Sequence, residues 1–212
     1  MYNQTFSWKK FNENPIVGIV RGMNTPKVLD IIPTYLDSGF FTLEITMNSP
    51  NVLETIKTIA DSFPELNLGA GTVCNMDDLK KALDVGSQFI VTPIIDERVI
   101  KHCVANKIPI FPGGYTPTEI YKAWNLGADA VKIFPATQLG LQFIKDIQGP
   151  LSEIKLLPTG GVSKDNIDDF FQLGCVGVGM GSSLFDKQII EKGDKKELEK
   201  HFNQIKNASK KK

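Results

Sequence analysis

Short apolar runs and longer amphipathic segments alternate along almost the whole chain. Eight of the runs have the length and composition of buried parallel strands, and they recur at a spacing of roughly 20–25 residues. The predicted strands are residues 16–21, 40–47, 66–73, 89–94, 108–112, 130–136, 155–159 and 176–180. Eight strands that are each followed by a helix predict a (β/α)8 barrel of the α/β class. A doubly wound open sheet is disfavoured, because no G-x-G-x-x-G follows the first strand.

Helix signals fill the segments between the runs. Thr25, Ser49, Thr116 and Ser163 are the predicted N-caps, and proline follows the first three of them at the first helical position. The predicted helices are residues 26–38, 50–63, 76–85, 97–106, 117–126, 141–148, 164–173 and 195–207. No linker or change of composition divides the sequence, so residues 1–212 are expected to form one domain.

The barrel itself is expected over residues 15–185, with a C-terminal helix and tail over residues 186–212. A short helix is predicted at residues 2–13. It carries Phe6, Trp8 and Phe11, which suggests a lid over one end of the barrel.

Composition excludes several classes of protein. The chain has 24 basic and 24 acidic residues, which argues against a nucleic-acid or anionic-membrane partner. No apolar run approaches the ~18 residues of a membrane helix, and the first 14 residues lack the apolar core of a signal peptide. The three cysteines are an odd number without CxxC spacing, which argues against a disulfide scaffold or a zinc site and favours a reducing cytoplasm.

The sixth predicted strand contains a lysine. Side chains alternate along a strand, so Lys132 and Phe134 share one face while Val131 and Ile133 share the other. An unpaired buried charge is unfavourable, so this lysine needs a partner, an exit to water or a chemical role. Either Lys132 snorkels to solvent, or it is an amine kept neutral in an apolar site and nucleophilic toward a carbonyl carbon.

The second predicted strand contains a carboxylate. Leu43 and Ile45 occupy the opposite parity from Glu44, which places Glu44 inside the barrel. Lys132 is its predicted partner, either as a buried ion pair or as part of a catalytic pair. By contrast, Lys155 begins its strand at the opposite end of the barrel and is expected at the surface.

Other polar residues cluster at the carboxyl ends of the predicted strands, where barrel enzymes have their active sites. Arg21 and Thr72 could bind a carboxylate, although Thr72 could equally be a cap. Glycine-rich loops follow the last two strands, at residues 159–161 and 177–183, and they are either a phosphate cradle or tight turns. No cluster of residues has the spacing of metal ligands, so no metal or cofactor is expected.

The chain resembles the class I aldolases that act on 2-keto-3-deoxy-6-phosphogluconate (KDPG) and 4-hydroxy-2-oxoglutarate (KHG). The segments that carry the resemblance lie in the right order over residues 15–185. They are Leu43-Glu44-Ile45-Thr46, Gly69-Ala70-Gly71-Thr72-Val73, Pro112-Gly113 with Thr116-Pro117-Thr118-Glu119, Lys132-Ile133-Phe134-Pro135-Ala136, Pro158-Thr159-Gly160-Gly161-Val162, and Gly181-Ser182.

The resemblance implies a role for each site residue. Lys132 would form a Schiff base with the keto carbon, and Glu44 would shuttle protons. Arg21 and Thr72 would hold the pyruvyl carboxylate. The remaining substrate-binding residues would be Pro93, Phe134, Thr159, Gly160, Gly161, Gly181 and Ser182, the last five of them at the hydroxyls and phosphate of the aldehyde half. Such enzymes are commonly homotrimers, need no metal, and release pyruvate with glyceraldehyde 3-phosphate or, from KHG, glyoxylate.

The sequence departs from the family pattern in one respect. Many members have an arginine four residues after the glutamate, where this chain has Asn48, and Arg21 is expected to replace it. Arg21-Gly22 and Asn48-Ser49-Pro50 are more similar to the branch that acts on 2-dehydro-3-deoxy-6-phosphogalactonate. That branch tends to have valine in place of Thr159, so phosphogluconate is the favoured substrate and phosphogalactonate the alternative. A phosphosugar isomerase or epimerase and a non-catalytic phosphometabolite-binding protein are more distant alternatives.

Overall fold

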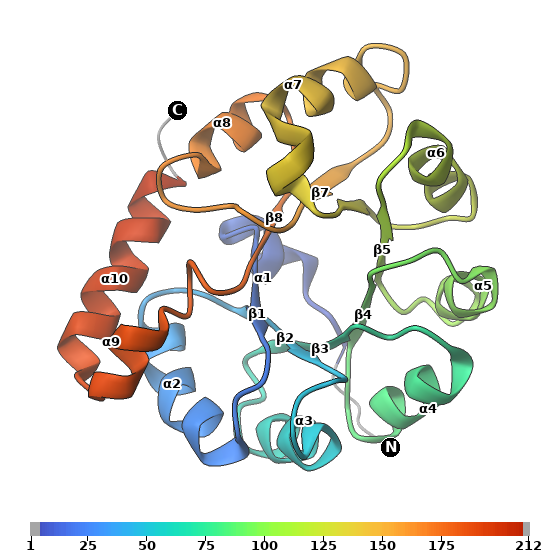
Figure 1. Ribbon diagram of the computed structural model, residues 1–212. Helices are drawn as coiled ribbons and strands as arrows, with labels where there is room; N and C mark the ends of the chain where they lie inside the picture. The colour runs from blue at the N-terminus through green and yellow to red at the C-terminus, as the bar shows by residue number, and fades with distance from the viewer. Residues whose placement is uncertain (1–4, 210–212) are drawn as a thin grey trace.

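Eight parallel strands form the centre of the molecule in the computed structural model, which describes residues 5–209 (Figure 1). The strands are β1 Ile16–Val20, β2 Thr42–Thr46, β3 Asn67–Gly71, β4 Phe89–Thr92, β5 Ile110–Gly114, β6 Val131–Ile133, β7 Leu156–Pro158 and β8 Val178–Met180. Their order in the sheet is β7-β6-β5-β4-β3-β2-β1-β8. A parallel bridge between Thr159 and Gly179 joins the two end strands. This is the predicted (β/α)8 barrel.

Helices alternate with the strands and surround them. They are α1 Trp8–Glu13, α2 Thr25–Asp37, α3 Val52–Ser62, α4 Met76–Asp84, α5 Glu97–Ala105, α6 Pro117–Asn125, α7 Ala136–Gln148, α8 Ile167–Gln172, α9 Lys187–Lys192 and α10 Lys195–Ala208. Within residues 5–209, no helix has both the length and the apolar character needed to cross a bilayer.

Three of the predicted N-caps are wrong. Asn24, and not Thr25, caps α2, because its side chain accepts from the Lys27 N–H while the Thr25 hydroxyl bonds to another helix. Asn51 is the N-cap residue of α3, and the Ser49 hydroxyl is used in a tertiary hydrogen bond. Asn166 precedes α8, so the predicted start at Ser163 is in the preceding turn. The predicted capping box at Thr116 and Glu119 is confirmed.

Several element boundaries also differ from prediction, among them those around β6. β6 ends at Ile133, because Pro135 has no N–H with which to continue the sheet. α7 spans Ala136–Gln148, but Gly140 interrupts it with φ 70° and ψ −179°. The part after this kink is the predicted helix 141–148, and the turn before it was not predicted. The sequence did not predict α9. Its signals are present nonetheless, since Asp186 caps the first turn and Gly193 ends the helix with a positive φ of 69°.

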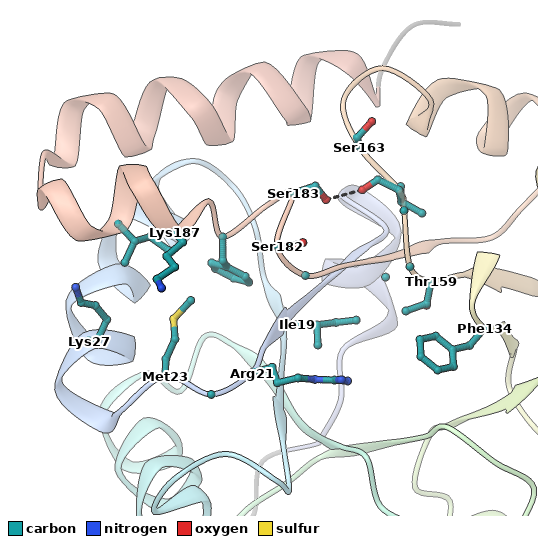
Figure 2. Close-up of a pocket in the computed structure, with 18 of the residues that line it drawn as sticks. Ile19, Arg21, Met23, Lys27, Phe134, Thr159, Ser163, Ser182, Ser183 and Lys187 are labelled. Atoms are coloured by element: carbon teal, nitrogen blue, oxygen red, sulfur yellow. Dashed lines mark hydrogen bonds between the residues drawn. The ribbon is translucent and has the colours of Figure 1, made fainter. Parts of the chain in front are cut away.

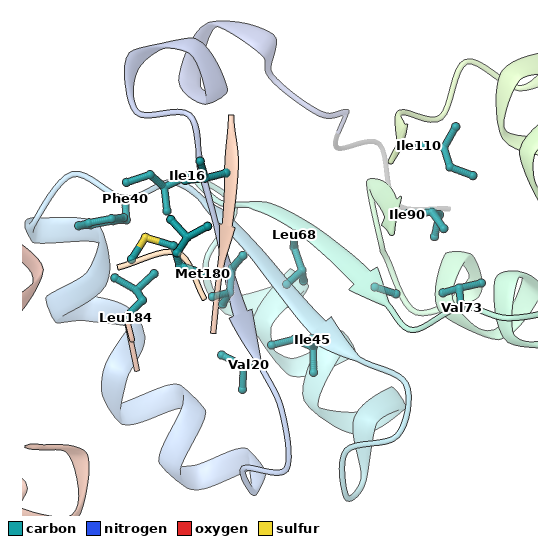
Figure 3. Close-up of a cluster of buried hydrophobic side chains, with 14 of the residues drawn as sticks. Ile16, Val20, Phe40, Ile45, Leu68, Val73, Ile90, Ile110, Met180 and Leu184 are labelled. Atoms are coloured by element: carbon teal, nitrogen blue, oxygen red, sulfur yellow. The ribbon is translucent and has the colours of Figure 1, made fainter. Parts of the chain in front are cut away.

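Apolar side chains fill two layers, one on each side of the barrel wall. Alternate strand residues such as Leu43, Ile45, Val131 and Ile133 point outward and pack beneath the helices. Figure 3 shows part of this layer around Ile16, Val20, Ile45 and Met180. The inward residues form a second cluster inside the barrel, and they are Val17, Ile19, Phe89, Val91, Phe111, Ala130 and Leu157.

The lid predicted over one end of the barrel covers its amino end. Its helix is shorter than the predicted residues 2–13, because α1 begins at Trp8, and residues 2–4 lie outside the described part of the chain. Phe6 and Phe11 are buried in the inner cluster, and the ring centroids of Phe6 and Phe89 are 5.3 Å apart. The Ser7 N–H donates to Oδ1 of Asn67, the first residue of β3, at 2.7 Å. Because this end is filled by aromatic rings, the carboxyl ends of the strands are left as the open face.

Candidate active site

Lys132 lies inside the barrel wall. It is the middle residue of β6, it pairs in register with Gly113 and Leu157, and it is only 3 % exposed. Its Nζ is 4.7 Å from the centroid of the Phe134 ring. Desolvation lowers the pKa of Lys132, and the positive charge of Arg21 lowers it further, while Glu44 and Cys74 oppose the shift. The amine therefore loses its proton more readily than an ordinary lysine.

Glu44 faces the same interior from β2. It pairs with Gly69, it is 1 % exposed, and its Oε1 has no hydrogen-bond partner among the described residues. Desolvation raises the pKa of this carboxyl group, and the charges of Lys132 and Arg21 only partly oppose the shift.

The two groups influence each other without a direct ion pair. Within residues 5–209, the seven ion pairs closer than 4.0 Å do not include Lys132 with Glu44. Burial favours the neutral form of both groups, the free amine and the protonated acid. A pair of titratable groups with pKa values displaced by their environment is the usual arrangement for general acid–base chemistry.

A cavity of about 880 Å³ opens at the carboxyl ends of β1, β6, β7 and β8. Seven residues predicted for the site line it: Arg21, Phe134, Thr159, Gly160, Gly161, Gly181 and Ser182. Figure 2 shows Arg21 and Phe134 facing one another across this space, with Thr159 beside Phe134. Lys132 and Glu44 are not in the wall, but Phe134 is, and its ring is in contact with the Lys132 amine.

Thr72 and Pro93 lie outside this cavity. Thr72 directly follows β3, is half-buried, and has a left-handed backbone with φ 58°. Pro93 follows β4, and its carbonyl lies 2.7 Å from where a Cβ on Gly113 would be. Gly113 on β5 pairs with Lys132 on β6, so β5 alone separates Pro93 from the strand that carries the amine. Both residues are at the predicted end of the barrel, and their contact with substrate stays a prediction.

Several contributors to the site were not predicted. The Gly22 N–H donates to Ser49 Oγ at 2.9 Å, and Ser49 Oγ also bonds Thr46 Oγ1 at 3.0 Å. The loop after β2 thereby fixes the loop that carries Arg21. Nothing in the sequence signals this bond, because its partners are 27 positions apart. The cavity wall also includes Ile19, Met23, Lys27, Ser163, Ser183, Phe185 and Lys187.

Lys155 was correctly predicted to lie at the surface. Lys155 is exposed and precedes β7. His201 hydrogen-bonds the carbonyls of Ser183 and Leu184, each at 3.1 Å. Among the described residues, no group of three or more His, Cys, Asp or Glu side chains could hold a metal ion.

Comparison with known proteins adds to this geometry. Residues 8–201 match the family model described as KDPG and KHG aldolase. This chain belongs to the KDPG and KHG aldolase family. It is therefore a lyase, and the isomerase, epimerase and non-catalytic alternatives are set aside.

Relatives within the family are named for two different substrates. The 2-dehydro-3-deoxy-6-phosphogalactonate aldolase of Escherichia coli K12 is 36 % identical over 173 residues, which are 81 % of this chain and 84 % of that protein. A solved structure described as native KDPGal has a TM-score of 0.84 at 33 % identity and covers 92 % of this chain and 93 % of its own. The KDPG aldolase of Zymomonas mobilis ZM4, solved with 3-phosphoglycerate, has a TM-score of 0.83 at 26 % identity and covers 93 % of each chain.

Proposed function

We propose that this protein is a class I aldolase, and that Lys132 is its Schiff-base residue. The observation that carries the proposal is a lysine amine that is 3 % exposed inside an aldolase barrel and whose pKa is lowered by desolvation. A neutral amine has the lone pair that attack on a ketone requires.

The reaction follows from that amine. Lys132 Nζ adds to the C2 keto carbon of the substrate to give a carbinolamine, which loses water to form an iminium. The electron pair of the C3–C4 bond then flows into the iminium, giving an enamine, while the C4 hydroxyl loses its proton and the aldehyde half leaves. Protonation of the enamine at C3 and hydrolysis release pyruvate and restore the amine. The iminium supplies the electron sink, so the proposed mechanism requires no metal or other cofactor.

Glu44 is the proposed proton carrier for these steps. Its burial raises its pKa above that of an ordinary carboxyl group, so it holds a proton more readily and can act in turn as acid and base. It would protonate the hydroxyl of the carbinolamine and accept the C4 hydroxyl proton, directly or through a water molecule.

The cavity suits a substrate that is acidic at both ends. The Arg21 guanidinium, with Thr72, would hold the carboxylate next to the keto carbon. Gly160 and Gly161 after β7, with Gly181 and Ser182 after β8, would present N–H groups to a terminal phosphate. A phosphorylated ligand in the Zymomonas relative supports this assignment. We therefore infer a 2-keto-3-deoxy-6-phosphosugar acid as substrate, with glyceraldehyde 3-phosphate as the aldehyde product.

The configuration at C4 distinguishes two candidate substrates. Thr159 supports the phosphogluconate epimer, because the phosphogalactonate branch tends to have valine at this position. Thr159 lines the cavity, and its hydroxyl makes only a long hydrogen bond of 3.4 Å to the Leu157 carbonyl. It is thus available to a substrate hydroxyl. The phosphogalactonate epimer is the second candidate, supported by the 36 % identical relative of that name. KHG, which would yield glyoxylate, is a further candidate.

Trapping with borohydride tests the Schiff base directly. Reduction in the presence of pyruvate should attach the pyruvyl group to Lys132, as located by mass spectrometry of peptides. Lys132→Met should lose the adduct, and the matched control Lys155→Met should keep it. An adduct on another residue would refute the assignment.

A coupled assay of pyruvate release identifies the substrate. Both phosphosugar acid epimers and KHG should be compared with a chelator present. The proposal expects cleavage of at least one of them at a rate that the chelator leaves unchanged. Loss of activity in chelator would refute metal independence.

We also infer a homotrimer in the cytoplasm, since related aldolases are commonly trimeric and Cys74, Cys103 and Cys175 are all free thiols. Light scattering on the purified protein measures the assembly, and a mass other than three times 23.5 kDa would contradict it.

A further inference from the structure

The cavity continues beyond the residues that the proposed reaction uses. Past the glycine loops it reaches Lys27 on α2 and Lys187 on α9. Figure 2 shows these two lysines at the end of the cavity opposite Phe134, with Met23 and Arg21 between. We call the part of the cavity between Lys27 and Lys187 the outer subsite.

The cavity wall is positively charged although the chain as a whole is neutral. The protein has 24 basic and 24 acidic residues. The charged residues of the wall are Arg21, Lys27 and Lys187, with Glu191 as the sole carboxylate. Such a concentration of one sign in a concave site attracts ligands of the opposite charge.

Neighbouring acids do not cancel this charge. Lys187 pairs with Glu191 at 3.6 Å, but their side chains are 85 % and 61 % exposed, and ion pairs so accessible to water are weak. Lys27 is half-buried and forms no ion pair with any residue of the described part of the chain.

Helix stability does not explain why a lysine occupies position 27 either. It lies in the first turn of α2, where the partial positive charge of the helix end disfavours a cation. Asn24 already satisfies the N–H of Lys27 as the N-cap. Lys27 therefore lies at a helix end that disfavours a cation, and it lines the cavity.

We propose that Lys27, assisted by Lys187, selects substrates whose aldehyde half ends in a phosphate. This inference rests on the proposed aldolase function and adds a specificity element to it. The two ammonium groups attract the phosphate dianion into the cavity and favour its binding from the side opposite the strand-end glycine loops. A substrate that ends in a neutral hydroxyl gains nothing from them.

Lys27→Gln tests the proposal by comparing a phosphorylated keto sugar acid with the same acid lacking its phosphate. For the phosphorylated substrate we expect kcat/KM to fall by about three- to tenfold, mainly through a higher KM. One attractive charge is lost, and water screens part of its interaction with the phosphate. Lys27→Glu should lower kcat/KM for the phosphorylated substrate further. For the unphosphorylated substrate, kcat/KM should change by less than about twofold.

Lys80→Gln is the matched control, because Lys80 is exposed on α4, forms no ion pair with a described residue, and is not in the cavity wall. This variant should leave kcat/KM for both substrates unchanged. Equal losses for both substrates in Lys27→Gln, or an unchanged KM for the phosphorylated one, would overturn the proposal. So would a loss of the same size in Lys80→Gln.

Binding of inorganic phosphate separates this inference from the proposed reaction. Phosphate should raise the melting temperature of the wild-type protein and should do so less in Lys27→Gln at the same concentration. If no keto sugar acid were cleaved, the proposed function would fail, and this titration would still decide whether Lys27 attracts phosphate. Equal stabilisation of the two proteins would refute the role of Lys27.

Discussion

The carboxylate of Glu44 occupies the space in which a side chain at residue 71 would lie. A Cβ built on Gly71 would overlap Oε1 and the carboxyl carbon of Glu44. Gly71 is the last residue of β3, and it pairs with Thr46 on the neighbouring strand. The missing side chain is therefore what allows the carboxylate to lie in its present orientation inside the barrel.

Gly71→Ala is expected to displace this carboxylate. Its backbone does not have the positive φ that would itself exclude alanine, so the effect should come from the collision. We expect turnover to fall by about 10- to 100-fold, because a misplaced catalytic group loses much of its effect. Overpacking should also lower the free energy of unfolding by about 1–3 kcal/mol.

Steady-state turnover and urea denaturation measure these two effects. The control is Gly149→Ala, where the nearest atom to a new Cβ is 3.5 Å away and φ is −55°. Full turnover in Gly71→Ala would show that the orientation of Glu44 does not matter.

Glu44→Gln removes the proposed proton carrier while keeping its size. Turnover should fall by about 10²–10⁴-fold, the usual contribution of a general acid–base group. Borohydride should still trap pyruvate on Lys132, more slowly than in the wild type. Wild-type turnover in this variant would exclude Glu44 as the proton carrier.

The same substitution should change how stability depends on pH. Burial raises the pKa of Glu44 above the ordinary value of 4.5, so above pH 4.5 the folded protein holds a proton that the unfolded chain has released. The stabilising contribution is complete below pH 4.5 and is lost as pH rises through the folded pKa. The wild type should therefore lose stability relative to Glu44→Gln with rising pH, as measured by denaturant unfolding at several pH values. The opposite trend would show that the pKa is lowered.

Arg21 should influence the amine as well as the substrate. Its positive charge contributes to the lowered pKa of Lys132, after the larger effect of desolvation. Arg21→Gln should therefore raise that pKa, and the pH profile of pyruvate trapping should move to higher pH. The KM for pyruvate should rise by about 10- to 100-fold if a charged hydrogen bond to the carboxylate is lost.

Arg98→Gln provides the control for this shift. Arg98 is exposed and pairs with Asp96 at 2.9 Å, away from the cavity. The pH profile of pyruvate trapping by the Arg98→Gln variant should match that of the wild type. A profile that stays in place in Arg21→Gln would mean that desolvation alone lowers the pKa of Lys132.

Thr159→Val tests which epimer the site recognises. Thr159 lines the cavity, and valine keeps the shape of threonine while removing its hydroxyl. We expect the ratio of phosphogluconate to phosphogalactonate cleavage to fall by about tenfold, the effect of one lost hydrogen bond of ~1 kcal/mol or more. An unchanged ratio would assign C4 recognition to another residue.

Local patterns in the sequence were sufficient to predict the barrel and the burial of Lys132 and Glu44 inside it. The alternation of Val131 and Ile133 with Lys132, and of Leu43 and Ile45 with Glu44, correctly placed both charged groups inside the barrel. Alternation works here because both strands are covered by helices on their outer face, so side-chain parity determines which residues reach the interior.

Helix starts were harder to predict, because each polar side chain has several possible partners. Thr25 and Ser49 have cap-forming side chains beside proline, yet the first bonds Thr55 and the second bonds Gly22 and Thr46. Thr55 and Gly22 are 30 and 27 positions away from these hydroxyls and come close to them only in the folded protein. The resulting hydrogen bonds compete with capping, and the neighbouring asparagines Asn24 and Asn51 occupy the cap positions instead.

By itself, then, the sequence determined the barrel, the inward faces of its strands and the lysine–glutamate pair, because these depend on the periodicity of neighbouring positions. Only the tertiary structure decided that Glu44 lies over Gly71, that Ser49 fixes the loop of Arg21, and that Lys27 and Lys187 line one cavity with Thr159. These relationships join residues far apart in the chain. They depend on how the strands stagger as the barrel closes, and periodicity along a single strand carries no information about that stagger.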